Sequence, residues 1–176
     1  MDRFGFIREK LDIKILILFV LRRLPGPVDF HTLLELAFID GGIDYFDYTQ
    51  CLPELIDTGH IRLIEEGYEI TELGDQHCLA VESSLPYSVR VKAENKAAPL
   101  IRKMKRDMLI GTSHEILPKG GCMVKLSLSD GVGDILNLSI LASDEEQALD
   151  IEKFFRSDAE GVYHKIIELL SPEDKH

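Results

Sequence analysis

The chain has 176 residues, of which 45% are hydrophobic, and it carries a formal net charge of −11 at pH 7. This composition is sufficient for one or two ordinary globular cores and excludes an intrinsically disordered chain. The longest apolar run, residues 15–21, is far shorter than the roughly 20 residues of a membrane span, and no secretory signal is visible. Three widely spaced cysteines indicate neither a disulfide framework nor a zinc site, so we expect a reducing, cytoplasmic location.

Two helices are predicted at the start of the chain. Residues 11–24 are apolar on most sides and predict a buried helix, which Pro25-Gly26-Pro27 ends. Asp29 offers an N-cap for a second helix that runs to about residue 39. Gly41-Gly42 then supplies a turn.

A third helix is predicted to end near Thr58, because Gly59 tolerates the positive φ of a helix C-terminus. Its core side chains repeat at helical spacing: Leu52, Leu55 and Ile56. Pro53 conflicts with this helix because it removes a backbone donor. The helix therefore either starts late, near Thr49, or kinks at the proline.

A β-hairpin is predicted directly after the third helix. Residues 61–63 and 68–70 flank the turn Glu65-Glu66-Gly67, and Thr71 is an N-cap for a fourth helix. The order helix, helix, turn, helix, hairpin is that of a winged helix-turn-helix domain. We assign this domain to residues 1–85.

The second half of the chain predicts mainly strands. Residues 86–99 form a connecting helix that ends before Pro99. Alternating side chains predict a half-buried strand from about residue 103 to residue 116. Clearer alternation at 124–128 and 136–140, each preceded by a glycine-containing turn, completes a three-stranded antiparallel sheet.

Two helices are predicted at the end of the chain. Ser143 and Glu146 form a capping box for a helix through Phe155, and Asp158 caps a last helix. The core stripe of that last helix comprises Ala159, Val162, Ile166 and Leu170. The predicted fold is therefore α+β: a winged helix-turn-helix domain, then an α+β dimerisation or sensor domain over residues 100–176, with both helices on one face of the sheet.

The charge is distributed unevenly along the chain. Residues 86–109 carry seven Lys and Arg against two Asp and Glu, whereas residues 1–85 carry seven against sixteen and residues 110–176 carry six against thirteen. The basic stretch between residues 90 and 106 is therefore where phosphate binding is expected, if nucleic acid is the partner.

Several segments together resemble a known family. These are LPELIDTGHI, YEITELG, MVKLSLSD, ILNLSILASDEEQA and AEGVYHKIIELL. They resemble a bacterial family catalogued as domain-of-unknown-function family 4364, over nearly the full length. The resemblance implies an N-terminal winged helix, a small α/β C-terminal domain and a predicted role in transcription regulation, and it supplies no catalytic or ligand residues. The chain departs from the family in having Phe155 where a tryptophan is expected, and in its acidic third helix.

The candidate DNA contacts lie on the third helix, the wing and the basic stretch. With Leu52, Leu55 and Ile56 inward, the outward positions are Asp47, Gln50, Cys51 and Glu54. Gln50 would pair with an adenine edge, Thr49 or Tyr48 would hold a phosphate, and Arg62 at the base of the wing would hold another. The second phosphate-contacting surface would comprise Arg90, Lys92, Lys96, Arg102, Lys103, Lys105 and Arg106.

Two alternatives remain open. The acidic third helix and the wing tip Glu65-Glu66 repel phosphate, so the domain is alternatively a winged-helix module that recognises a protein and not DNA. The basic stretch is alternatively a solvated face that offsets the acidic domains. The histidines lack ligand spacing and no catalytic motif is present, so we predict no enzyme activity, no metal and no cofactor. The main hypothesis is a homodimeric regulator of double-stranded DNA, whose C-terminal domain supports dimerisation or senses an unidentified effector.

Overall fold

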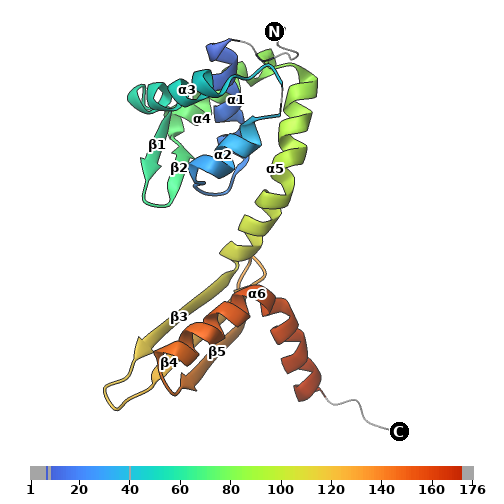
Figure 1. Ribbon diagram of the computed structural model, residues 1–176. Coiled ribbons are helices and arrows are strands. Elements are labelled where there is room, and N and C mark those ends of the chain that lie inside the picture. The colour runs from blue at the N-terminus through green and yellow to red at the C-terminus, as the bar shows by residue number, and fades with distance from the viewer. Residues whose placement is uncertain (1–6, 8, 40, 172–176) are drawn as a thin grey trace. The chain divides into compact units, whose positions relative to one another are not determined.

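A computed structural model describes residue 7, residues 9–39 and residues 41–171. The fold is α+β, and the chain forms two compact units, residues 1–104 and 105–176 (Figure 1). The first unit contains a two-stranded sheet, and the second contains a three-stranded sheet. Within the described residues, every helix is too short or too polar to cross a membrane.

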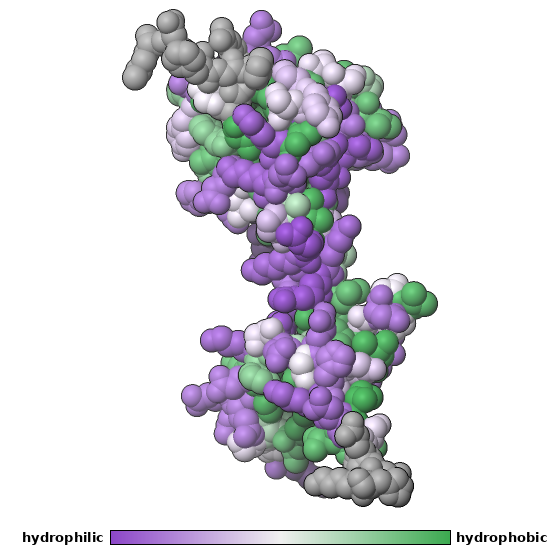
Figure 2. Space-filling model, turned by 90° about the vertical axis from the view of Figure 1, so that its right-hand side faces the viewer, coloured by the Kyte–Doolittle hydropathy of each residue, from purple (hydrophilic) through white to green (hydrophobic). Residues whose placement is uncertain are grey.

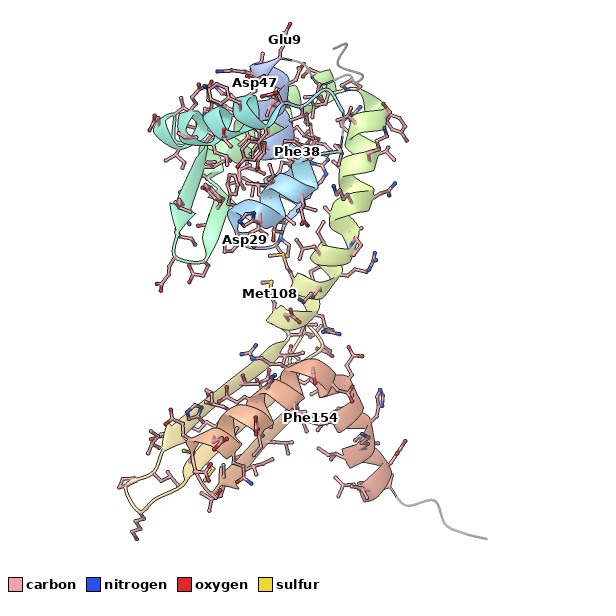
Figure 3. The ribbon with its side chains drawn as sticks, viewed as in Figure 1. Glu9, Asp29, Phe38, Asp47, Met108 and Phe154 are labelled. Carbon is pink, nitrogen blue, oxygen red and sulfur yellow. The ribbon has the colours of Figure 1, made fainter. Side chains whose placement is uncertain are left out.

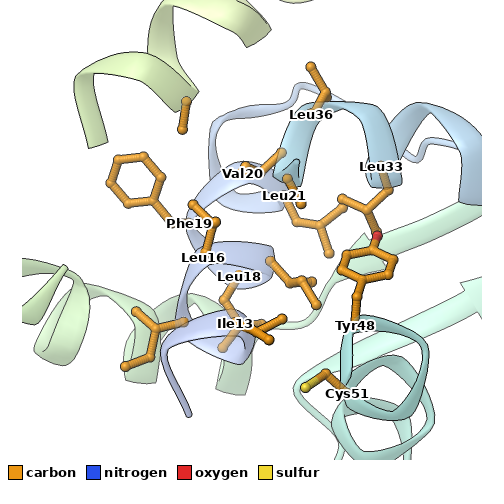
Figure 4. Close-up of a cluster of buried hydrophobic side chains, with 14 of the residues drawn as sticks. Ile13, Leu16, Leu18, Phe19, Val20, Leu21, Leu33, Leu36, Tyr48 and Cys51 are labelled. Atoms are coloured by element: carbon orange, nitrogen blue, oxygen red, sulfur yellow. The ribbon is translucent and has the colours of Figure 1, made fainter. Parts of the chain in front are cut away.

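Helix α1 (Lys10–Arg23) is the centre of the first unit. Eight of its side chains between Ile13 and Leu21 are buried, which agrees with a helix that is apolar on most sides. Around it pack α2 (Phe30–Ala37), α3 (Tyr45–Asp57), α4 (Glu72–Val81) and α5 (Tyr87–Met108). Figure 4 shows α1 and α2 contributing side chains to one cluster that also receives Tyr48 and Cys51 from α3.

Aspartates cap the second and third helices. Asp29 Oδ1 accepts hydrogen bonds from the backbone N–H of His31 at 2.8 Å and of Thr32 at 3.0 Å, at the start of α2 (Figure 3). The Thr32 hydroxyl also donates to this carboxylate, and these bonds hold the pKa of Asp29 below its ordinary value. Asp44 caps α3 in the same way, so α3 begins at Tyr45 and continues through Pro53. The interpretation that this helix starts late, near Thr49, is therefore wrong.

The predicted hairpin is present. Strands β1 (Ile61–Ile64) and β2 (Gly67–Ile70) pair antiparallel, and the backbone of Tyr68 forms a bridge with Val28 before α2. Thr71 caps α4, because its hydroxyl accepts from the backbone N–H of Gly74 at 3.1 Å. A short 3₁₀ helix, Glu82–Ser84, then separates α4 from α5.

A pair of histidines joins the base of this hairpin to α4. His60 Nε2 lies 2.8 Å from His77 Nδ1, and His60 Nδ1 lies 2.8 Å from the Thr58 hydroxyl. Burial is the main cause that lowers the pKa of His60 below its ordinary value, and the charges of His77 and Lys14 lower it further. The unfolded chain therefore takes up a proton here more readily than the folded chain does.

We predict a pH dependence of stability from this pair. The contribution of His60 is complete above the unfolded pKa of about 6.5 and is lost as the pH falls through the lower folded pKa. His60→Gln should therefore flatten the decline in the free energy of unfolding between about pH 7.5 and 5.5, measured by urea titration. His164→Gln, at an exposed position on α6, should retain the wild-type decline. Equal declines in the wild type and His60→Gln would contradict the prediction.

Helix α5 extends further than predicted. It runs through Pro99 to Met108, so the predictions of a connecting helix confined to 86–99 and of a strand from residue 103 are wrong. The helix continues because Ala97, Leu100 and Ile101 on both sides of the proline pack on the core of the first unit. This burial offsets the lost backbone hydrogen bond, while Pro99 itself is exposed.

The second unit contains an antiparallel sheet in the order β3 (Ile110–Ile116), β4 (Cys122–Ser129), β5 (Asp134–Ala142). Alternate residues of β4 are buried against α6 (Glu145–Leu170), as the sequence alternation predicts. The side chains on the other face are mainly polar, and include Ser113, Lys125 and Ser139. The sheet therefore has one apolar face and one solvated face.

Helix α6 has two halves that meet at Asp158. Asp158 has non-helical φ/ψ values of −148° and 47°, and its carboxylate accepts from the backbone N–H of Gly161 at 3.2 Å, so it caps the second half as predicted. The predicted cap of the first half is wrong by one residue. Asp144 is the N-cap and accepts from the N–H of Gln147 at 2.8 Å, and Gln147 Oε1 accepts in return from the N–H of Ser143.

The first half of α6 covers the sheet, and the second half contacts the core of the sheet only at its start, through Ala159, Val162 and Tyr163. Ala148 and Phe155 are buried on it, and in the second half Ala159 alone among the described residues is buried. The second half leaves the sheet at the kink (Figure 1). The prediction that both C-terminal helices cover one face therefore holds for the last helix only at its start, because Asp158 redirects the chain.

Candidate nucleic-acid interface

The buried face of α3 differs from the predicted one. It comprises Tyr48, Cys51, Leu52 and Leu55, and the Tyr48 side chain is completely buried. The predictions that Tyr48 holds a phosphate and that Cys51 faces outward are therefore wrong. The spacing i, i+3, i+4, i+7 of these four residues is itself a helical core stripe and is visible in the sequence. The predicted core face included Ile56, which is only half-buried, and it was therefore turned away from Tyr48 and Cys51.

Tyr48 lies among aromatic rings. Its ring makes edge contacts with Phe30 and Phe38, at centroid distances of 6.1 and 5.6 Å, and points into the cluster shown in Figure 4. The hydroxyl is buried without a hydrogen-bond partner among the described residues. Burial raises the pKa of Tyr48 well above its ordinary value. The ring therefore stabilises the core while its hydroxyl costs free energy.

Tyr48→Phe is accordingly expected to stabilise the protein. It removes an unsatisfied buried hydroxyl and keeps the aromatic contacts, so the free energy of unfolding should rise by about 1 kcal/mol. Urea denaturation of the two proteins measures the difference. Tyr68→Phe is a matched control at a half-buried tyrosine and should change the free energy of unfolding less. A loss of stability in Tyr48→Phe would show that the hydroxyl has a partner.

The polar residues of α3 are engaged by α1. Lys10 donates to the Gln50 side chain, and Lys14 forms an ion pair with Glu54 at 2.6 Å. The hydrogen bond from Lys14 lowers the pKa of Glu54. The Thr49 hydroxyl donates to the Phe46 carbonyl at 2.9 Å within α3. Gln50 and Thr49 are thus half-buried and locally bonded, and Lys10 and Lys14 offset part of the acidic charge beside them.

The exposed part of α3 is aromatic. Tyr45 and Phe46, in its first turn, are 56% and 66% exposed. The helix contains no lysine or arginine. Arg62, the predicted wing contact, forms an ion pair with Glu69 on the neighbouring strand. The face of α3 and the hairpin therefore offer little free positive charge to a phosphate backbone.

Helix α5 carries the positive charge of the site. Lys92, Lys96, Lys103 and Arg106 follow one another at spacings of four, seven and three residues, and all four are exposed. Arg102 and Lys105 flank this row and are also exposed. The row of four lies along one side of the helix, next to the side that carries the apolar residues Val89, Ala93, Ala97, Leu100 and Met104, and Arg102 and Lys105 lie on the remaining exposed surface. We call these six residues the basic face of α5.

Most of the basic face has no local partner. Lys92, Arg102, Lys103 and Lys105 form no hydrogen bond or ion pair with any described residue. Lys96 Nζ donates to the Phe38 carbonyl at 3.2 Å, and Arg106 lies 3.7 Å from Asp107. Figure 2 shows the hydrophilic surface over the last turns of α5. In Figure 1 this helix lies on the side of the first unit away from the β1–β2 hairpin.

Arg90 does not belong to the basic face. It is half-buried on the other side of α5, its Nε is buried without a partner among the described residues, and its guanidinium lies 5.9 Å from the Tyr87 ring centroid. Helical geometry directs Arg90 toward the first unit and not along the row of exposed cations, and its phosphate contact stays a prediction.

No cluster of metal ligands is found in the part of the chain that the structure describes. There, no group of three or more His, Cys, Asp and Glu side chains is placed to hold a metal ion. All three cysteines are free and buried. Burial raises the pKa of Cys78 to about 11, and also raises that of Cys51, so both favour the unreactive thiol.

The fold and the site thus define an α+β protein with a helical, hairpin-containing first unit and a basic α5. Residues 13–170 match the model of a family described as Domain of unknown function (DUF4364), and the chain belongs to this family. No curated protein and no solved structure matches the chain.

Proposed function

We propose that this protein is a DNA-binding transcriptional regulator that acts as a homodimer and holds the phosphate backbone of double-stranded DNA with the basic face of α5. The observation that carries the proposal is the exposed row of cations on one side of this helix, in a chain with a net charge of −11. Positive charge concentrated on one surface of an acidic protein is the electrostatic footprint of a nucleic-acid site.

In this proposal the first unit is a winged helix-turn-helix domain. The order of α1, α2, α3 and the β1–β2 hairpin supports this interpretation. Helix α3 would contribute base contacts through Thr49 and Gln50, and Gln50 would first have to release Lys10. We therefore propose that α5 provides most of the affinity for DNA and that α3 provides the specificity for its base sequence.

The proposal is tested by binding the protein to a labelled pool of duplexes from the source genome. The affinity for the retained duplexes is then measured by fluorescence anisotropy at several salt concentrations. The logarithm of the association constant should fall linearly with the logarithm of salt concentration, by about 0.9 for each phosphate contacted. Enrichment of a palindromic site would support the dimer, because the symmetry of the site mirrors that of the protein. Failure to retain any duplex at low salt would overturn the proposal.

A second candidate function is recognition of a protein through α3. It is favoured by the exposed Tyr45 and Phe46 on a helix without cations, because aromatic residues are enriched at protein interfaces. The double variant Tyr45→Ser and Phe46→Ser separates the two functions. A partner retained by the wild type and lost by this variant, with DNA affinity unchanged, would establish the second function alongside the first.

A further inference from the structure

The second unit has an uncovered apolar groove beside the edge of its sheet. The groove has a volume of about 390 Å³. It is lined on the sheet side by Leu126, Leu138 and Ile140, and on the helix side mainly by Ile151, Phe154 and Val162. Phe154 is 59% exposed and lies close to the kink of α6 (Figure 3). Apolar surface of this kind normally has a partner.

The second half of α6 is an apolar helix that packs on the core of the second unit only through Ala159, Val162 and Tyr163 at its start. Along residues 159–170, which we call the arm, Val162, Ile166 and Leu169 continue from the buried Ala159 at spacings of three, four and three residues. Leu169 and Leu170 are 80% and 75% exposed. Because an isolated helix of this length is marginal in water, the arm needs a surface on which to pack. Exposed hydrophobic residues are visible on residues 105–176 in Figure 2.

The groove lies next to an unprotected edge strand. Strand β5 is at the edge of the sheet, and residues 135–142 contain no charged residue and no proline. Strand β3, at the other edge, carries His114, which pairs with Glu152 on α6 at 2.7 Å, and the charged Glu115. An edge strand without charge or proline is a template on which another chain can pair.

A second copy of this chain brings both an arm and a groove. The large exposed residues beside the groove and on the stripe of the arm, Ile140, Phe154, Leu169 and Leu170, present on the order of 500 Å² per copy, so two copies would bury about the 1,000 Å² that a specific interface needs.

We propose that a second copy of this chain covers the face, with the arm of each copy packed into the groove of the other. The contact is reciprocal, as a two-fold dimer requires, because groove and arm belong to the same helix α6. The inference deepens the homodimer of the proposed function but does not rest on DNA binding. Failure of the duplex-binding experiment would therefore leave it untouched.

The first test is the mass of the full chain in solution. Sedimentation equilibrium should give about 40 kDa, twice the 19.9 kDa of one chain. Leu169→Glu with Leu170→Glu should weaken dimerisation by about a hundredfold or more, because the double variant places two charges in the apolar groove of the other copy. The matched control, Leu73→Glu with Leu79→Glu on exposed positions of α4, should remain dimeric. Circular dichroism establishes that both variants keep their helices.

The second test separates exchange of arms from other contacts. Phe154→Glu damages the groove and keeps the arm, whereas the Leu169/Leu170 variant damages the arm and keeps the groove. Each variant alone should be monomeric, and a mixture should form a heterodimer through the one intact arm and groove. A monomeric wild type would overturn the proposal. An arm variant that stays dimeric would also overturn it. A mixture that stays monomeric would overturn it as well, because each arm would then pack on its own chain or elsewhere.

Discussion

Replacing Lys92, Lys96, Lys103 and Arg106 together with glutamine is expected to lower the affinity for duplex DNA by about two orders of magnitude or more at low salt. These four residues form the exposed row on α5. Glutamine is uncharged but can still donate hydrogen bonds, so the substitution mainly removes charge. The apolar side of α5 is not altered, so the first unit should unfold at the same urea concentration.

The salt dependence gives the sharper readout. Each lost phosphate contact removes about 0.9 from the slope of the logarithm of affinity against the logarithm of salt concentration, so four lost contacts remove about 3.6. A dimer that places both copies on one duplex loses twice as much. The change in slope therefore reports the number of chains on the DNA as well as the role of α5.

A charge-matched control distinguishes contact from net charge. Glutamine at Lys119, Lys125, Lys153 and Lys165, four exposed positions of the second unit, changes the net charge by the same amount. This variant should bind with a nearly wild-type slope. If both variants lose the same slope, long-range electrostatics and not the basic face of α5 governs binding, and the assignment of the site to α5 fails.

Local signals account for the parts of the fold that the sequence predicts. The hairpin follows from two short apolar runs around Gly67, and Asp29, Thr71 and Asp158 act as N-caps in the structure. Each of these features depends on residues within about four positions of one another, through a turn or a single side-chain hydrogen bond. Such features can be predicted from the sequence without knowledge of the tertiary contacts.

Features decided by distant contacts were not predictable in this way. Pro99 signals the end of a helix, but Ala97 and Leu100 pack on residues far away in the chain and keep α5 helical. The engagement of Gln50 by Lys10 on α1 is likewise invisible until the two helices are placed side by side. Of the two surfaces that the sequence offers, α3 has its polar side chains engaged and α5 has most of its cations free among the described residues, because partners as far as forty residues away decide whether a polar side chain is available.

Gly74→Ala is expected to destabilise the first unit by about 2–3 kcal/mol, although alanine at a helical glycine normally stabilises. A Cβ atom at Gly74 would lie 2.0 Å from the His60 carbonyl oxygen. This oxygen accepts the backbone N–H of Thr71 at 3.0 Å, so moving it breaks a bond at the base of the hairpin. The Thr71 hydroxyl, which caps α4 at Gly74, also donates to the Gly59 carbonyl at 2.6 Å and holds the same loop.

The sign of this effect is the test of the packing between α4 and the hairpin. Gly133→Ala is the matched control, because no atom lies within 4 Å of its Cβ position and its φ is not positive, so it should change the free energy of unfolding by less than about 0.5 kcal/mol. Urea denaturation of both variants gives the comparison. A Gly74→Ala protein as stable as the wild type would mean that α4 is free to move away from His60 and that the base of the hairpin is not held in place by this packing.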